Sequence, residues 1–193
     1  MKRIALIMSL LCCMLSASAQ DAKGWSIIPH ANIGTALDFL YVPENHLIYG
    51  TYRADVGIDA KYSFNGHWSL LAGIECDYRP DKSVAVTSYR PYFRVPVRAE
   101  FSHKWFYVNF GPYLERTTRP WVDTRCYENF GYGIVTEIGG RIRLSANDRL
   151  RLGLQNQLGL SLITYHNDFG EKEYHKCSSF ASALISLGYE HRF

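Results

Sequence analysis

Apolar and polar residues alternate with a period of two along most of the chain. In the segment Ser179–Phe193, Ile185 and Leu187 share one parity, whereas Ser186 and Glu190 share the other. Because successive side chains of a β-strand point to opposite faces, this pattern predicts a strand with one apolar and one polar face. We expect the first strand of the mature chain to pair with this last strand and close a barrel.

The alternation recurs in eight segments, which predicts an all-β fold: an eight-stranded antiparallel up-and-down transmembrane β-barrel. The predicted strands are Trp25–Tyr41, Tyr49–Phe64, His67–Tyr78, Tyr89–Phe101, Trp105–Glu115, Phe130–Leu144, Arg149–Ile163 and Ser179–Phe193. Short turns alternate strictly with longer connections, as short periplasmic turns and long outer loops do in outer-membrane barrels. The short turns are Asn65-Gly66, Ser102–Lys104 and Ser145–Asp148, and the longer connections are Val42–Ile48, Arg79–Ser88, Arg116–Asn129 and Thr164–Ser178.

Charge and aromatic residues distinguish a membrane barrel from a water-soluble sandwich, which would also show alternation. The apolar parity of the segments contains almost no charged residue. Aromatic residues gather at both ends of the predicted strands, as in the girdles of membrane barrels. The first girdle, beside the short turns and termini, contains Trp25, Phe64, Trp68, Phe101, Trp105 and Phe193; the second contains Tyr41, Tyr49, Tyr52, Tyr78, Tyr89, Phe130 and Tyr132.

The first residues have the features of a secretory signal peptide. Lys2 and Arg3 precede the apolar run Ile4–Leu15, and Ala17-Ser18-Ala19 forms a cleavage site. This predicts a signal peptide over residues 1–19, a barrel domain over residues 20–193, and a location in the outer membrane of a Gram-negative bacterium. The net charge of +3 falls close to zero once the signal is removed, which argues against a nucleic-acid partner.

Two pairs of segments carry a family resemblance. Arg94–Glu100 (RVPVRAE) and Trp105–Tyr113 (WFYVNFGPY) resemble a strand–turn–strand pattern of PorT-like outer-membrane β-barrels of the Bacteroidetes type. Arg149–Leu162 and the terminal Gly188–Phe193 are similar to the closing hairpin of that family. The resemblance implies an eight-stranded barrel. It implies no settled activity and no catalytic residue.

The polar parity carries nearly all the acidic and basic residues of the strands, so these side chains are expected to point into one lumen. An eight-stranded barrel has room inside only for side chains, which favours a packed salt-bridge core over the alternative, a narrow ion path. The predicted lumen charge network contains Arg53, Asp55, Asp59, Glu75, Asp77, Arg90, Arg94, Arg98, Glu100, Glu137, Arg141, Arg143 and Arg151.

Three cysteines follow the signal peptide, and an exported chain meets an oxidising compartment. Cys126 and Cys177 lie in connections at the same predicted end of the barrel, so we expect a disulfide between them, with three unpaired thiols as the alternative. Cys76 is predicted to face lipid as a small hydrophobe.

The sequence contains no convincing catalytic or metal site. Thr164–Ser178 contains two histidines among acidic residues, but their spacing matches no ligand motif. His30 has only Ser26 as a nearby serine in its own strand. We therefore expect no cofactor, no metal and no enzyme activity; the alternatives are a lipid- or peptide-modifying barrel enzyme and a narrow channel.

The expected role is in envelope structure or in surface binding through the long loops. The expected partners are outer-membrane lipid and the barrel-assembly machinery, and the sequence does not identify a surface ligand. Tyr189 and Phe193, at the end of the closing strand, are the predicted assembly signal.

Overall fold

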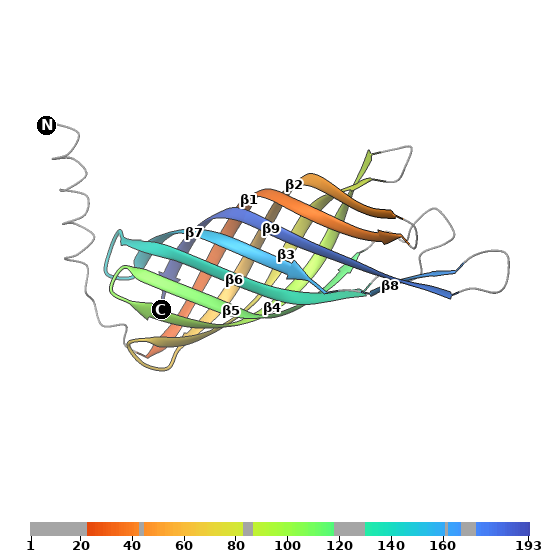
Figure 1. The fold of residues 1–193 in the computed structure, drawn as a ribbon. Helices are drawn as coiled ribbons and strands as arrows, with labels where there is room; N and C mark the ends of the chain where they lie inside the picture. Colours follow the sequence, from red (N-terminus) through yellow and green to blue (C-terminus); the bar gives the residue numbers. More distant parts are fainter. Residues whose placement is uncertain (1–22, 43–44, 83–86, 118–129, 161, 167–172) are drawn as a thin grey trace, which may run out of the picture.

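The chain forms a closed antiparallel barrel in the computed structural model, which describes residues 23–42, 45–82, 87–117, 130–160, 162–166 and 173–193 (Figure 1). The strands are β1 (Gly24–Val42), β2 (Asn45–Ser63), β3 (Trp68–Lys82), β4 (Thr87–His103), β5 (Phe106–Thr117), β6 (Phe130–Arg143), β7 (Asp148–Gly159), β8 (Leu162–His166) and β9 (Glu173–Arg192). The predicted signal peptide and Cys126 lie outside the described residues. Within those residues, no helix is long and apolar enough to cross a membrane.

Eight of these strands make the barrel wall. Neighbouring strands pair in the order β1-β2-β3-β4-β5-β6-β7-β9, and β1 pairs with β9 to close the sheet. Ile33 of β1 lies opposite Ile185 of β9, as the predicted pairing of the first and last strands requires. The prediction of a closed eight-stranded antiparallel barrel is therefore confirmed.

Strand β8 lies in a segment that the sequence pattern predicts to be mostly loop. The sequence pattern predicts a strand as far as Ile163 and a loop over Thr164–Ser178, but β8 pairs with the first residues of β9, from Leu162 opposite Cys177 to His166 opposite Glu173. This hairpin continues past the barrel wall (Figure 1). Its Leu, Ile, Thr and Tyr residues favour an extended backbone, and this preference, with the cross-strand partner, outweighs the polar composition of the segment.

The three tight turns lie at the same end as the start of β1 and the end of β9 (Figure 1). In the first turn, the side-chain oxygen of Asn65 accepts hydrogen bonds of 2.8 Å from the backbone N–H groups of His67 and Trp68. The connection therefore spans Phe64–His67 and is longer than a two-residue Asn-Gly turn. In the second turn, Lys104 has a φ of 54°, a left-handed conformation that a residue with a Cβ adopts at some energetic expense.

Alternate residues of each strand face opposite sides of the wall. On β7, Leu152, Leu154 and Leu158 are exposed on the outside, whereas Gln155 and Gln157 are buried in the lumen. Other strands repeat the pattern, and Cys76 is a free thiol on the outward parity of β3. The outer wall is thus a continuous apolar surface. The exposed large apolar side chains of the wall include Ile33, Leu37, Val56, Ile58, Leu70, Ile74, Phe93, Val95, Val97, Phe110, Leu114, Ile134, Ile138, Ile185 and Leu187.

Aromatic side chains form a girdle around the outside of the turn end. The rings of Trp25 and Tyr62 lie 4.9 Å apart, and those of Trp68 and Phe101 lie 5.2 Å apart in an edge-on arrangement. At the opposite end, the exposed aromatic residues with described side chains are Tyr52, Tyr78, Phe130 and Tyr132. Two such girdles enclosing an apolar band are the outer surface that a lipid bilayer requires.

Candidate functional site: the luminal charge network

The lumen contains a network of buried ionisable side chains that point inward from seven of the eight wall strands. We call this set the luminal charge network. Its described members are Arg53, Asp55, Asp59, Lys61, Glu75, Asp77, Arg94, Arg98, Glu100, Glu115, Glu137, Arg141, Arg151 and Glu190, all of them buried. The strand register brings opposite charges together, for example Glu75 of β3 directly opposite Arg94 of β4.

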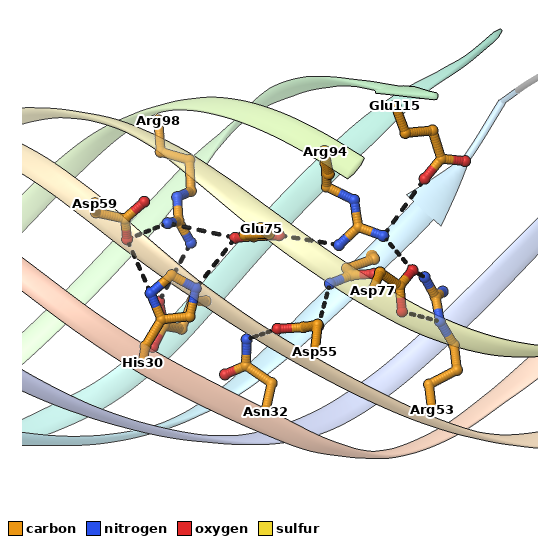
Figure 2. Close-up of polar contacts among 12 residues, drawn as sticks. His30, Asn32, Arg53, Asp55, Asp59, Glu75, Asp77, Arg94, Arg98 and Glu115 are labelled. Carbon is orange, nitrogen blue, oxygen red and sulfur yellow. Dashed lines mark hydrogen bonds and ion pairs between the residues drawn. The ribbon is translucent and has the colours of Figure 1, made fainter. Parts of the chain in front are cut away.

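Arg94 is the centre of the loop-end part of the network (Figure 2). Its guanidinium donates to Glu75 at 3.0 Å and to Asp77 at 2.6 Å, and it lies 3.4 Å from Glu115. It also stacks on the ring of Tyr113, 4.6 Å from the ring centroid. Arg94 thus bridges β3, β4 and β5, and it is fully buried.

Arg98 occupies the middle of the lumen. It donates to Asp59 of β2 and lies 3.7 Å from Glu75 and 3.8 Å from Glu137 of β6. His30 of β1 completes this part, with its ring nitrogens 3.5 Å from Asp59 and 3.4 Å from Glu75 (Figure 2). The middle layer therefore links one side of the barrel to the other.

At the turn end of the network, Lys61 and Arg151 meet the two carboxylates Glu100 and Glu190, and Arg141 donates to the backbone oxygen of Lys104 at 3.3 Å. Lys61 lies 2.8 Å from both Glu100 and Glu190. Arg151 lies 2.6 Å from Glu100 and 3.5 Å from Glu190. Its guanidinium also stacks on the ring of Tyr107, 3.9 Å from the centroid. Since Arg151 is on β7 and Glu100 on β4, this pair crosses the lumen.

The structure places most of the predicted network residues together in the lumen. Arg143 is the exception: it is exposed at the end of β6, where its Nε donates to the backbone oxygen of Ser145. The expectation for Arg143 is wrong because the strand ends there, so its side chain has no lumen to enter. The side chains of Arg90 and Cys177 lie outside the described residues, as does the predicted bridge to Cys126.

The prediction omits several luminal residues. Lys61, Glu115 and Glu190 share the inward parity of their strands, so the alternation itself could have identified them. Tyr107 and Tyr113 also share that parity on β5, but aromatic residues in a membrane strand are usually assigned to the lipid face. Inside this barrel they are fully buried and support the guanidinium groups of Arg151 and Arg94.

Small residues in the wall leave room for these tyrosines. A Cβ at Gly139 would lie 2.7 Å from the ring of Tyr107, and one at Gly153 would lie 2.8 Å from its hydroxyl. Bulky luminal side chains facing glycines leave little free volume. A cavity of about 10 Å³ beside His30, Arg98 and Gln155 is about the size needed to accommodate one water molecule.

The described residues contain no group of three or more His, Cys, Asp or Glu side chains that could hold a metal ion. Most of the ionisable side chains instead form ion pairs with one another. Burial makes this pairing necessary, because an isolated charge in a low-dielectric interior is unfavourable by several kcal/mol.

The closed eight-stranded wall, its apolar outer face and its two aromatic girdles define a small integral outer-membrane β-barrel protein. This class is located in the outer membrane of Gram-negative bacteria, where its apolar band contacts lipid.

The comparison with solved structures agrees with this class. The chain superimposes on the outer membrane protein OprG from Pseudomonas aeruginosa with a TM-score of 0.59 and 9% identity, over 91% of this chain and 99% of that one. It also superimposes on the outer membrane protein AlkL, solved in lipid bilayers, with a TM-score of 0.56 and 12% identity, over 91% and 93% of the two chains. The sequence matches no protein-family model and no curated protein.

Proposed function

We propose that this protein is a non-conducting, non-enzymatic barrel that anchors long hairpins in the outer membrane for envelope structure or surface binding. The observation that carries the proposal is that ion pairs and hydrogen bonds cross the lumen. Glu100 of β4 pairs with Arg151 of β7, and Asp55 of β2 accepts a 3.3 Å hydrogen bond from Gln157 of β7. Neither pair joins neighbouring strands, so each one obstructs a path along the barrel axis.

A channel needs a continuous water-filled path, whereas buried ion pairs favour a lumen filled with side chains. Separating Arg151 from Glu100 would leave two charges without their partner in a low-dielectric interior, at a free-energy expense of several kcal/mol. We therefore expect the barrel to act as a membrane anchor, with its long hairpins as the parts that meet other molecules.

Membership of the PorT-like family is part of the proposal. The segments that resemble this family, Arg94–Glu100 and Trp105–Tyr113, form the hairpin of β4 and β5. They supply both Arg94 and the tyrosine on which its guanidinium stacks. In this proposal the motif supplies a pair of side chains, Arg94 and Tyr113, that pack together in the lumen.

Recognition by the barrel-assembly machinery is a second part of the proposal. Tyr189 and Phe193 are exposed at the end of the closing strand, with 41% and 76% of their surface accessible. An exposed aromatic end of the last strand is available to an assembly factor before the barrel closes against β1. Removal of Phe193 is expected to reduce membrane insertion without altering the luminal network.

The proposal is tested by measuring conductance across a planar bilayer that contains the purified protein. We expect no conductance steps from the native barrel and stable steps from an Arg151→Ala, Glu100→Ala double variant, which removes an ion pair that crosses the lumen. Protease added to intact cells should cut within Arg116–Asn129 and leave Lys104 intact. Regular conductance steps from the native protein would contradict the proposal.

A further inference from the structure

Asp55 differs from the other carboxylates of the luminal charge network in its partners. It is buried, with 1% of its surface accessible. Its side-chain hydrogen bonds are with two amides. Nδ2 of Asn32 donates to Oδ1 (Figure 2), and Nε2 of Gln157 donates to Oδ2 at 3.3 Å. Among the described residues, no cationic group forms an ion pair with Asp55.

The neighbouring carboxylates add further negative charge around Asp55. Asp77 of β3 lies directly opposite Asp55 in the strand register, and Glu75 on the same strand is a second nearby carboxylate. Like charges directly opposite each other destabilise a pair of strands. The nearest cation on β4, Arg94, directs its guanidinium to Glu75 and Asp77, and Arg53 on β2 also pairs with Asp77.

The described part of the network carries more negative than positive groups. The carboxylates are Asp55, Asp59, Glu75, Asp77, Glu100, Glu115, Glu137 and Glu190, and the permanent cations are Arg53, Lys61, Arg94, Arg98, Arg141 and Arg151. With His30 protonated, the described carboxylates would still outnumber the described cations by one. Because an unpaired buried charge is so unfavourable, a carboxyl that has no cationic partner among the described residues, as Asp55 has none, is expected to neutralise instead.

The amide groups beside Asp55 identify where a proton would be bound. Asn32 and Gln157 are buried to 97% or more, and Oδ1 of Asn32 and Oε1 of Gln157 have no hydrogen-bond partner among the described residues. A carboxylate accepts hydrogen bonds but cannot donate to these oxygens, whereas a neutral carboxyl has one O–H to give. Rotating either amide by 180° presents its oxygen to Asp55.

We propose that Asp55 is a proton-binding site that stays neutral at a pH where free aspartate is ionised, and that it donates its O–H to the side-chain oxygen of Asn32 or Gln157. The proton removes the repulsion between Asp55 and Asp77 and leaves Arg53 and Arg94 to the carboxylates that need them. The inference concerns the barrel interior and is independent of what the hairpins bind. Loss of the proton would restore two like charges facing each other across β2 and β3.

Infrared spectroscopy of the barrel in lipid tests this proposal directly. At about pH 5.5, where free Asp and Glu side chains are mostly ionised, the native protein should show the carbonyl stretch of a neutral carboxylic acid, which shifts in D₂O. Asp55→Asn should remove this band, whereas the matched variant Asp59→Asn should retain it, because Asp59 pairs with Arg98. Absence of the band from the native protein, or its persistence in Asp55→Asn, would overturn the proposal.

A second measurement uses the native chain and is independent of the infrared assignment. Free Asp loses its proton near pH 4, so unfolding of the native barrel should release the Asp55 proton. As the pH rises above about 4, the folding equilibrium constant should fall about tenfold per pH unit until Asp55 itself ionises in the folded barrel. Asp55→Asn should remove this pH dependence. If the folding constant instead rises with NaCl or KCl in the native protein but not in Asp55→Asn, a bound cation and not a proton neutralises Asp55. That result would refute the proposal.

Discussion

Replacing Arg94 with Met removes the central cation of the loop-end network and keeps much of the aliphatic stem. The variant loses the hydrogen bonds of 3.0 Å to Glu75, 2.6 Å to Asp77 and 3.4 Å to Glu115, and it loses the guanidinium above Tyr113. The carboxylates stay in place, buried and acceptor-only. The folded barrel should therefore be less stable, whereas the unfolded chain, in which Arg94 is hydrated, is little affected.

The magnitude follows from what each carboxylate retains. Breaking a fully buried pair destabilises a protein by about 3–5 kcal/mol. Asp77 keeps its ion pair with Arg53, and Glu75 keeps Arg98 at 3.7 Å. We therefore expect the lower part of that range, about 3 kcal/mol. Because the remaining defect is excess negative charge, adding Glu75→Gln to Arg94→Met should recover part of the loss.

The assay is reversible unfolding by urea in lipid vesicles, followed by the fluorescence of the tryptophans in the turn-end girdle. Arg143→Met is the matched control, because Arg143 is exposed and lies outside the network; its effect should stay within about 0.5 kcal/mol. If Arg94→Met and Arg143→Met had the same unfolding free energy, the ion pairs of Arg94 would not stabilise the barrel, and this reasoning would be refuted.

Three further predictions concern the wall and the turns. Leu152→Arg on the lipid face should destabilise the barrel by about 2–4 kcal/mol in a vesicle-refolding titration, against about 0–1 kcal/mol for Leu144→Arg near the interface; equal effects would contradict the lipid-facing assignment. Gly111→Ala should reduce the folded fraction in heat-modifiable gel migration, because a Cβ there would overlap the carbonyl oxygen of Val97 in β4; unchanged migration would contradict this contact. Hydrogen bonds from Ser145, Tyr189 and His191 hold the pKa of Asp148 below its ordinary value of 3.8, so the native protein should lose stability relative to Asp148→Asn only as the pH falls below about 4.

Alternation was enough to predict the wall of this barrel. Because the side-chain period of a strand is two, residues such as Leu152 and Gln155 are assigned to opposite faces without knowledge of their neighbours. The closure of β9 on β1 was also predictable, because a strand edge left unpaired in hydrocarbon is strongly unfavourable. Strand ends were less predictable: Arg143 keeps the inward parity but lies beyond the lumen.

The partners within the lumen could not be predicted from parity. Which acid meets which base depends on strand register and barrel shear, which set the height of each side chain. The pairing of Glu100 with Arg151 joins residues of β4 and β7, and nothing local to either residue indicates it. The luminal tyrosines and the partners of Asp55 depend on the same long-range geometry.

The central claim is that each of the eight wall strands has one face that meets lipid and one that packs into a closed lumen. It is tested most directly by spin labels placed one at a time over residues 150–158 of β7 in a cysteine-free protein reconstituted in vesicles. Collision rates with oxygen, which dissolves in lipid, should be high at Leu152, Leu154 and Leu158 and low at Gln155 and Gln157, with a period of two. Equal oxygen collision rates at all positions, or high collision rates with a water-soluble nickel reagent at the leucines, would contradict the transmembrane barrel.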